Sequence, residues 1–300
     1  LFMVTNPPVM AMLVGMVNRL KRIPILYLIH DLYPDVPVAL GLWRADGAFV
    51  RALRWFQRTV LEESARIVVL GRCMRDYLVR NYRIDPGKIS VIPSWFTVAD
   101  GRGGAESRIQ ANTFNVVYSG NLGQFQDFET ILDGAELLRP YPSIRVHVVG
   151  DGARAAWLRD EVARRQLSNV VLRPFLPDDQ FLELLRSASL GIVTLERNME
   201  GLGVPSKTYN LLAMGVPLLA VLGEQSEVAR LIAEHGVGYR VDHGDARGFA
   251  NSVLHAYTNP EQRAMMAERA RAYAYAEASP EAVAKRYAEE LFRIAQFASP

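Results

Sequence analysis

One segment of this 300-residue chain, residues 200–210 (EGLGVPSKTYN), combines residue types that could bind an anion. A glycine-containing loop leads here into a predicted helix, with Pro205 suited to the first helical turn and Ser206 or Thr208 able to cap it. The first turn of a helix exposes unpaired amides and the positive end of the helix dipole, and Lys207 adds a full charge. The segment therefore predicts a diphosphate site, and the alternative is an ordinary loop before a capped helix.

Two more glycine-containing loops follow predicted strands. Residues 118–127 (YSGNLGQFQD) allow a ligand to approach the backbone closely, or form a tight turn with Asp127 as the helix N-cap. Residues 150–155 (GDGARA) match the pattern of a dinucleotide-binding loop, but they follow the second strand of their sheet, and the next strand ends in Arg173. This order argues against an NAD-dependent oxidoreductase, although an arginine there would suit the 2′-phosphate of NADP.

A histidine beside an aspartate follows the buried strand predicted over residues 23–29. The neutral imidazole of His30, next to Asp31, could hydrogen-bond a phosphate or a sugar during a reaction, whereas a lone histidine more often has a structural role. His235 and His243 flank a turn without a third ligand, so we interpret them as surface residues rather than metal ligands.

The helix predicted over residues 46–64 mixes basic and aromatic side chains. Arg51, Arg54 and Arg58 share one of its faces, and aromatic residues are interleaved with them between residues 43 and 58. A basic face bordered by aromatic rings suits anionic lipid headgroups, and the alternative is a solvated helix whose aromatic residues belong to the core. The net charge of +2 argues against nucleic acid as a partner.

These residues need elements that bring them together, and the hydrophobic pattern alternates between strands and helices throughout. Such alternation predicts parallel sheets, with ligands bound at the carboxyl ends of the strands. Strands are predicted over residues 23–29, 67–70 and 89–92, and then over 115–118, 144–149, 169–172, 190–194, 217–222 and 238–241. Helices are predicted over residues 9–20, 46–64, 73–82, 127–138, 153–165, 178–187, 207–214, 226–234, 245–259 and 281–297.

Composition limits the class of protein. A hydrophobic content of 50% with 22% charged residues indicates a globular chain with a sizeable core. The apolar run at residues 9–17 is about half of the roughly 20 residues that a membrane-spanning helix needs, so we expect none. Cys73 is the single cysteine, which excludes an internal disulfide and cysteine-based zinc sites and favours a reducing, cytoplasmic location.

Charge and glycine content predict a domain boundary. Residues 1–108 carry 15 Lys and Arg against 9 Asp and Glu, whereas residues 109–300 carry 19 against 23. With the glycine-rich break at residues 100–104, this places the boundary near residues 98–110. Residues 1–8 resemble the end of a buried strand, so we expect that on the order of 90 residues of the first domain precede them.

Five motifs occur in a characteristic order: IHDLYPD (29–35) with LG (40–41), VIPSW (91–95), SGNLG (119–123) with Asp127 and ETI (129–131), VGDG (149–152), and VPSKTYN (204–210) with Ala213 and GVP (215–217). In these motifs the chain, from residue 25 to residue 257, resembles a family 4 glycosyltransferase of the GT-B fold, in the branch that builds bacterial surface polysaccharides. The resemblance implies an α/β protein of two Rossmann-like, doubly wound domains with a cleft between them. It implies a partial acceptor-side domain over residues 1–108, a donor-binding domain over 109–275 and a returning C-terminal helix over 276–300.

The resemblance also implies an activity. This is transfer of a sugar, with retention, from a nucleotide diphosphate sugar, first of all a UDP-sugar, to a lipid-linked or polysaccharide acceptor in cell-surface glycan biosynthesis. No Asp-x-Asp sequence is present to hold a metal, so the implied reaction is metal-independent and needs no cofactor besides the sugar nucleotide. The enzyme would work in the cytoplasm, in peripheral contact with the inner face of the membrane.

The same resemblance implies roles for individual residues. Catalytic roles fall to His30, Lys207 and Glu200, and the amides of the helix beginning at Pro205 and of the 120–123 loop would stabilise the leaving diphosphate. The nucleotide base would lie near residues 173–175. The implied donor-binding residues are Gly120, Asn121, Leu122, Gly123, Arg173, Pro174, Phe175, Gly201, Leu202, Gly203, Val204, Pro205, Ser206, Thr208 and Asn210. On the acceptor or membrane side they are Asp31, Arg51, Arg54 and Arg58.

The chain departs from the family pattern at the site itself. Of the usual two glutamates eight residues apart, Asn210 replaces the second, and Glu200 stands two residues out of register for the first, with Glu196 as another candidate. The usual basic pair after the first strand of the second domain is replaced by Asn121 and Gln126. More of the diphosphate charge would therefore fall on Lys207.

Two other functional classes remain open at this point. An NADP-dependent oxidoreductase would use Gly150 and Gly152 together with Arg173. A non-catalytic module for nucleotide sugars or membranes would keep Lys207 and Gly120 without a functioning His30.

Overall fold

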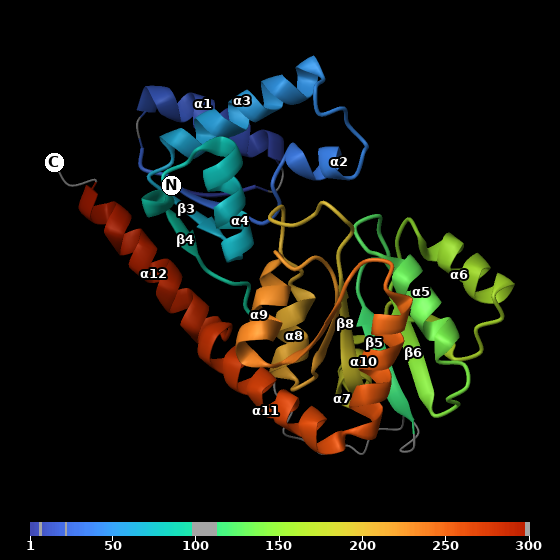
Figure 1. Ribbon diagram of the computed structural model, residues 1–300. Helices are drawn as coiled ribbons and strands as arrows, with labels where there is room; N and C mark the ends of the chain where they lie inside the picture. Colours follow the sequence, from blue (N-terminus) through green and yellow to red (C-terminus); the bar gives the residue numbers. More distant parts are fainter. Residues whose placement is uncertain (6–7, 22, 98–112, 298–300) are drawn as a thin grey trace.

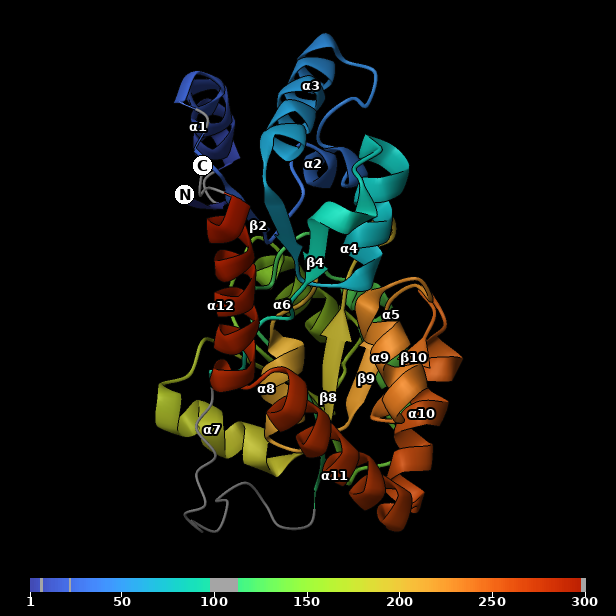
Figure 2. The same cartoon turned by 90° about the vertical axis from the view of Figure 1, so that its left-hand side faces the viewer.

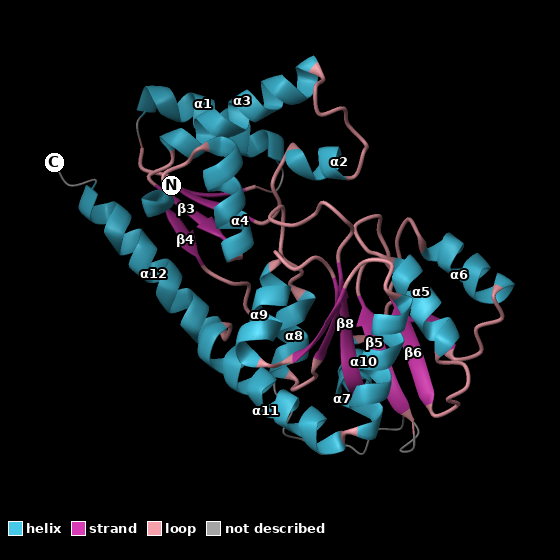
Figure 3. Ribbon diagram, viewed as in Figure 1, coloured by secondary structure: helices cyan, strands magenta, loops and turns pink. Residues whose placement is uncertain are grey.

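The computed structural model describes residues 1–5, 8–21, 23–97 and 113–297 (Figure 1). Strands and helices alternate along the chain and form two separate parallel sheets, so the predicted pair of Rossmann-like units is confirmed. In Figure 3 the strands of each sheet lie between helices. The predicted boundary near residues 98–110 lies outside the described residues.

The first sheet has four parallel strands in chain order, β1 (Phe2–Val4), β2 (Leu26–Ile29), β3 (Arg66–Val69) and β4 (Ile89–Val91). Strands β2 and β3 are short apolar runs, as expected for central strands covered on both faces. The helices of this half are α1 (Pro8–Lys21), α2 (Asp35–Ala39), α3 (Ala48–Glu63) and α4 (Arg72–Tyr77), with the π-helical turn η1 (Leu78–Tyr82) and the 3₁₀ turn η2 (Pro86–Lys88). Helix α2 was not predicted, because its five residues include a proline and are too few to show a period.

The second sheet has six parallel strands in the order β10-β9-β8-β5-β6-β7. They are β5 (Phe114–Ser119), β6 (Ile144–Val149), β7 (Val170–Arg173), β8 (Ala188–Thr194), β9 (Leu218–Val221) and β10 (Gly238–Val241). The helices around them are α5 (Phe128–Leu137), α6 (Ala155–Arg164), α7 (Asp178–Ser187), α8 (Lys207–Ala213), α9 (Glu227–His235) and α10 (Ala246–Thr258). The order of strands reverses between β5 and β8, and ligands bind at such a point in open α/β sheets.

Two long helices lead the chain back to its first half. Helix α11 (Pro260–Glu277) lies against α8, and α12 (Pro280–Phe297) runs beside the first sheet (Figure 2). Val283 on α12 is buried in the first core, and Arg66 on β3 forms an ion pair with Glu290, with 2.7 Å between Nε and Oε2. The C-terminal helix therefore ties the two halves together.

None of the helices in the described parts of the chain is long and apolar enough to cross a membrane.

Candidate active site

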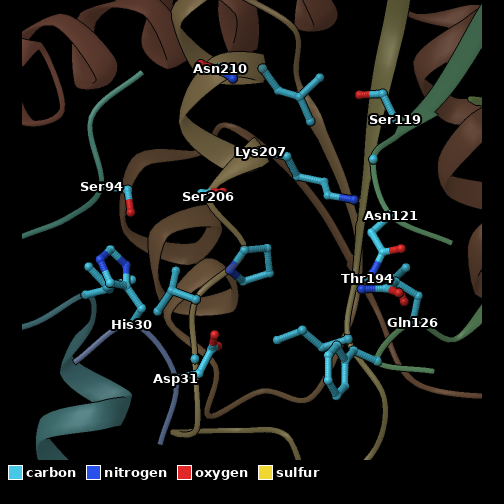
Figure 4. Close-up of a pocket in the computed structure, with 18 of the residues that line it drawn as sticks. His30, Asp31, Ser94, Ser119, Asn121, Gln126, Thr194, Ser206, Lys207 and Asn210 are labelled. Carbon is cyan, nitrogen blue, oxygen red and sulfur yellow. The ribbon is translucent and has the colours of Figure 1, made fainter. Parts of the chain in front are cut away.

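A cavity of about 700 Å³ lies between the two sheets, at the carboxyl ends of their strands (Figure 4). Ser119 at the end of β5 and Thr194 at the end of β8 line it, so the cavity opens at the point where the strand order reverses. His30 and Asp31, which follow β2, line it from the first sheet. The elements of both halves therefore contribute to one site.

Lys207 points into this cavity from the start of α8, with its amine toward Asn121 (Figure 4). The amine is buried and makes no hydrogen bond to any residue that the structure describes. Burial lowers the pKa of Lys207 to about 7. Burial of an amine without a hydrogen-bond partner costs free energy, and an anion that enters the cavity could supply that partner.

Gly120 makes room for this lysine. Its φ of +138° lies in a region that side chains rarely adopt, and a Cβ there would stand 2.7 Å from the Lys207 Nζ. The absence of a side chain at Gly120 therefore lets the Lys207 amine lie directly against the 118–127 loop.

Most amides of that loop donate hydrogen bonds to groups within the protein, whereas the resemblance implied that they would stabilise the leaving diphosphate. Gly120 donates to the Val149 carbonyl (2.9 Å), Leu122 to the Asp151 carbonyl (2.8 Å) and Gly123 to Gln126 Oε1 (3.1 Å). Gly120 and Asn121 line the cavity, whereas Leu122 and Gly123 do not. The alternative interpretation of Asp127 as the N-cap of α5 is confirmed, because its carboxylate accepts from the Thr130 amide at 2.9 Å.

The glycines of the 150–155 loop have a packing role. A Cβ at Gly150 would stand 1.8 Å from the Gly120 carbonyl oxygen, since the loops after β5 and β6 lie directly against each other. The same loop accepts the Leu122 amide through Asp151. Neither Gly150 nor Gly152 lines the cavity, so the sequence argument for an NADP site has no counterpart in its geometry.

Helix α8 begins at Lys207, as the sequence pattern predicts, and not at Pro205, as the resemblance implied. The Ser206 hydroxyl makes no capping hydrogen bond. Ser206 and Pro205 line the cavity, while the Thr208 side chain is fully buried beneath it. Because α8 has only seven residues, its dipole would attract an anion less than the charge of Lys207 would.

The loop before α8 joins the two halves of the molecule. The Leu32 amide donates to the Leu202 carbonyl at 2.9 Å, and Asp31 pairs with Gly203 in an isolated antiparallel bridge. Leu202 is buried in the core of the first half. Gly203 and Val204 line the cavity, whereas Gly201 and Leu202 hold this interdomain contact and do not line it.

His30 and Asp31 line the cavity across from Lys207 (Figure 4). Both side chains are exposed to the cavity, and the His30 amide donates to Thr5 Oγ1 at 3.0 Å. Loss of hydration raises the pKa of Asp31, and the adjacent His30 opposes this shift. These two side chains can meet a ligand that Lys207 holds from the other side.

The structure places Glu200, for which the resemblance implied a catalytic role, outside the cavity lining. Glu200 does not line the cavity, and its carboxylate lies against Gly223, near the end of β9. Glu196 does not line it either, and its carboxylate accepts from the Arg197 amide at 3.1 Å. In the described parts of the chain, the carboxylates that line the cavity belong to Asp31 and Asp178.

The remaining donor-side residues divide between the cavity and its surroundings. Phe175 lines the cavity with an exposed ring, whereas Arg173 and Pro174 do not line it. Asn210 lines it and its side-chain oxygen accepts from the Thr97 amide at 2.8 Å, so it also fixes the segment after β4. The sequence analysis assigned no site role to Ser119 or Thr194, although each ends a buried strand, which is the signal that could have found them.

The basic face of α3 is largely paired. Arg54 contacts the buried Asp35 (2.8 Å between Nη2 and Oδ1), and Arg58 contacts Glu62 (2.7 Å), while Arg51 is exposed. The aromatic residues beside them do not form the core, since Trp43, Phe49 and Trp55 are all exposed.

The other histidines have structural contacts. His243 is not a surface residue as expected, because its side chain is mostly buried and its Nδ1 lies 3.1 Å from the Asp127 carboxylate. His235 packs against the Tyr273 ring. Within residues 1–97 and 113–297, outside the gaps already named, no group of three or more His, Cys, Asp or Glu side chains is arranged to hold a metal ion.

Known proteins match both halves. Residues 105–273 match the family described as glycosyl transferases group 1, and residues 1–95 match a glycosyl transferase 4-like domain. The chain is 27% identical over 258 residues to WbjE of Pseudomonas aeruginosa and 26% identical over 214 residues to WcaI of Escherichia coli K12, both named as glycosyltransferases. These matches cover 83% and 68% of the chain but 64% and 52% of the relatives, so the chain spans less than two thirds of either.

A solved structure supports the fold. Anabaena HepE in complex with UDP superposes with a TM-score of 0.76 at 16% identity, over 94% of this chain and 76% of HepE. The two parallel sheets and this likeness confirm the expected GT-B fold. With more than half of its residues inside one family match, the chain belongs to the glycosyl transferases group 1 family.

Proposed function

We propose that the cavity binds the diphosphate of a UDP-sugar and that the chain transfers the sugar, with retention, to an acceptor. The observation that carries this proposal is the buried Lys207 amine, which has no hydrogen-bond partner among the described residues and points into the cavity where β5 and β8 diverge. An anion that enters there gains a charge interaction with an amine that is buried from solvent. The UDP found in HepE, a protein of the same fold, favours a uridine nucleotide.

The two sides of the cavity would have different roles in the reaction. Cleavage of the sugar–phosphate bond leaves negative charge on the departing diphosphate, and Lys207 would stabilise that charge without a metal ion. Ser119, Asn121 and Ser206 line the cavity on the same side and offer hydrogen bonds to phosphate or ribose. His30, on the opposite side, would hydrogen-bond the donor sugar or its phosphate in the transition state.

The acceptor would approach from the first half of the molecule. We propose a lipid-linked or polysaccharide acceptor, in keeping with WcaI, which is named for colanic acid biosynthesis. The exposed Trp43, Phe49 and Trp55, together with Arg51, would hold the enzyme at the inner face of the cytoplasmic membrane, where such acceptors are assembled.

Calorimetric titration tests donor binding. UDP, GDP and NADP are titrated into the chain and into Lys207→Ala, with and without Mg²⁺. We expect metal-independent UDP binding that weakens by at least about 30-fold in the variant, which corresponds to the roughly 2 kcal/mol or more of a desolvated charge pair. The control is Lys88→Ala, which removes a lysine bonded to the Glu62 carbonyl outside the cavity and should leave UDP binding unchanged.

Other outcomes would contradict specific parts of the proposal. Binding of NADP without UDP or GDP would contradict the nucleotide-sugar site, and a strict requirement for Mg²⁺ would contradict metal independence. UDP binding without turnover of a UDP-sugar would leave the non-catalytic module as the better description. The anomeric configuration of the product, observed by NMR, decides between retention and inversion.

A further inference from the structure

The buried amine of Lys207 contacts the face of an aromatic ring. Its Nζ lies 3.7 Å from the centroid of the Tyr118 ring. A cation over the face of an aromatic ring is attracted by the negative π surface, and the attraction is strongest where water is excluded. The ring therefore stabilises the charged form of an amine that burial alone pushes toward neutrality.

Tyr118 is itself held firmly in β5. Its side chain is fully buried, and its hydroxyl donates to the Asn121 carbonyl at 2.7 Å. The ring packs edge to face on Phe128, with 5.1 Å between the centroids. One side chain thus supports the lysine with its ring and the Asn121 loop with its hydroxyl.

No neighbouring carboxylate takes over this role in the described part of the site. The titratable groups that face the cavity with Lys207 are His30 and Asp31 after β2, Tyr33, and Asp178 at the start of α7. The shift in the pKa of Lys207 is caused by burial and by none of these charges. Before a ligand binds, the cation–π contact with the Tyr118 ring therefore favours the charged form of the Lys207 amine.

We propose that Tyr118 is a positioning residue that keeps the Lys207 ammonium charged and directed into the cavity until the donor diphosphate becomes its partner. This inference rests on the proposed function. Because the pKa of Lys207 is about 7 without ligand, a diphosphate that requires the charged form must draw a proton when it binds. We expect net proton uptake on donor binding that increases from pH 7 to pH 8.5.

The probe is UDP-glucose, whose diphosphate does not titrate near neutral pH. Its affinity is measured by calorimetry from pH 5.5 to pH 8.5, in pairs of buffers with different heats of ionisation, for the unmodified chain, Tyr118→Phe and Tyr118→Leu. The affinity of the unmodified chain should fall by up to about tenfold per pH unit above pH 7. Tyr118→Phe keeps the ring and should keep this profile.

Tyr118→Leu removes the ring and should move the midpoint of the profile about one pH unit lower. The affinity at pH 8 then falls by about tenfold relative to the unmodified chain, while the affinity at pH 5.5 stays nearly equal. Phe128→Leu is the matched control, because it removes a neighbouring buried ring for which no contact with Lys207 is found in the described site. A Tyr118→Leu profile with an unmoved midpoint, or an equal shift in Phe128→Leu, overturns the proposal.

A second readout separates this proposal from the proposed function. NMR titration of the lysine Cε signals, with Lys207 assigned from Lys207→Arg, follows the amine without any donor. A lower pH midpoint of the Lys207 titration in Tyr118→Leu supports the role of the ring, whether or not UDP-glucose binds. Failure of UDP-glucose to bind would contradict only the proposed UDP-sugar site. Thermal denaturation of each variant establishes that the folded protein is being compared.

Discussion

The two sides of the cavity differ in how their functional side chains are held. On the second-sheet side, Lys207 is buried over the Tyr118 ring, so its position is fixed before any ligand binds. On the first-sheet side, His30 and Asp31 are exposed and follow a short strand. A fixed charge suits recognition of the same diphosphate in every cycle, whereas exposed groups suit contact with a sugar that must move to an acceptor.

The largest effect should come from the first-sheet side and should appear in turnover. His30→Ala is expected to lower kcat for a UDP-sugar by about 10²- to 10⁴-fold, the usual contribution of a positioned acid–base group, while UDP affinity changes by less than about threefold. The control is His255→Ala, an exposed histidine of α10 bonded to the Tyr239 hydroxyl. Equal loss of kcat and of UDP affinity in His30→Ala would remove the distinction between the two sides.

The second-sheet side should be sensitive to a single methyl group. Gly150→Ala places a Cβ 1.8 Å from the Gly120 carbonyl oxygen at a φ of +149°, and both backbones must shift. We expect the free energy of unfolding to fall by about 3 kcal/mol or more, measured by urea denaturation, with weaker UDP binding. Gly87→Ala, in the exposed turn η2, is the control, and a similar loss there would show that the contact between the loops is not special.

The buried lysine should also leave a signature in stability. The pKa of Lys207 is about 7 in the folded protein and about 10.4 in an unfolded chain, so between these values the unfolded state binds more protons. Stability should therefore rise with pH across this window, by up to about 1.4 kcal/mol per pH unit more than in Lys207→Met. Urea denaturation from pH 6.5 to pH 9.5 measures this, and parallel curves for the two proteins would mean that the amine is not buried as described.

The smallest effect should come from the outer face of the first half. Trp55→Ala combined with Phe49→Ala removes exposed rings and should weaken co-sedimentation with phosphatidylglycerol vesicles several-fold, with little change for pure phosphatidylcholine. Phe292→Ala, an exposed ring on α12, is the control. Identical vesicle binding by all three proteins would contradict the proposed membrane role of this face, but it would not bear on the proposed UDP site.

The repeated pattern of strands and helices could be predicted from sequence because apolar runs and amphipathic stretches have different periods. Strand β6 and helix α7 were predicted with their observed bounds. Helix α11 was missed because it is rich in alanine and lacks an apolar stripe, and its small residues, such as Ala270 and Ala274, pack against α8 through the fold.

Within the site, the residue types indicated which chemistry to expect, but the sequence did not show which side chains face the cavity. The sequence predicted that Lys207 lies at the site, because a lysine after a glycine-containing loop brings a positive charge to the carboxyl ends of the strands, and the structure places it in the cavity. The position of Glu200 outside the cavity could not be predicted, because spacing along the chain does not show that the loop turns toward the first sheet through Leu202. The contact of Tyr118 with Lys207 was not predicted, since it joins positions almost ninety apart in sequence.

The hydrogen bond from Leu32 to Leu202, with the bridge between Asp31 and Gly203, has a consequence for recombining such enzymes. The loop at residues 199–204 belongs to the second half by sequence, but Met199 and Leu202 are buried in the core of the first half. A hybrid built by joining halves from two relatives at residues 98–112 would separate this loop from the surface that it fits. A crossover design should instead inherit residues 199–204 and the segment after β2 from the same parent.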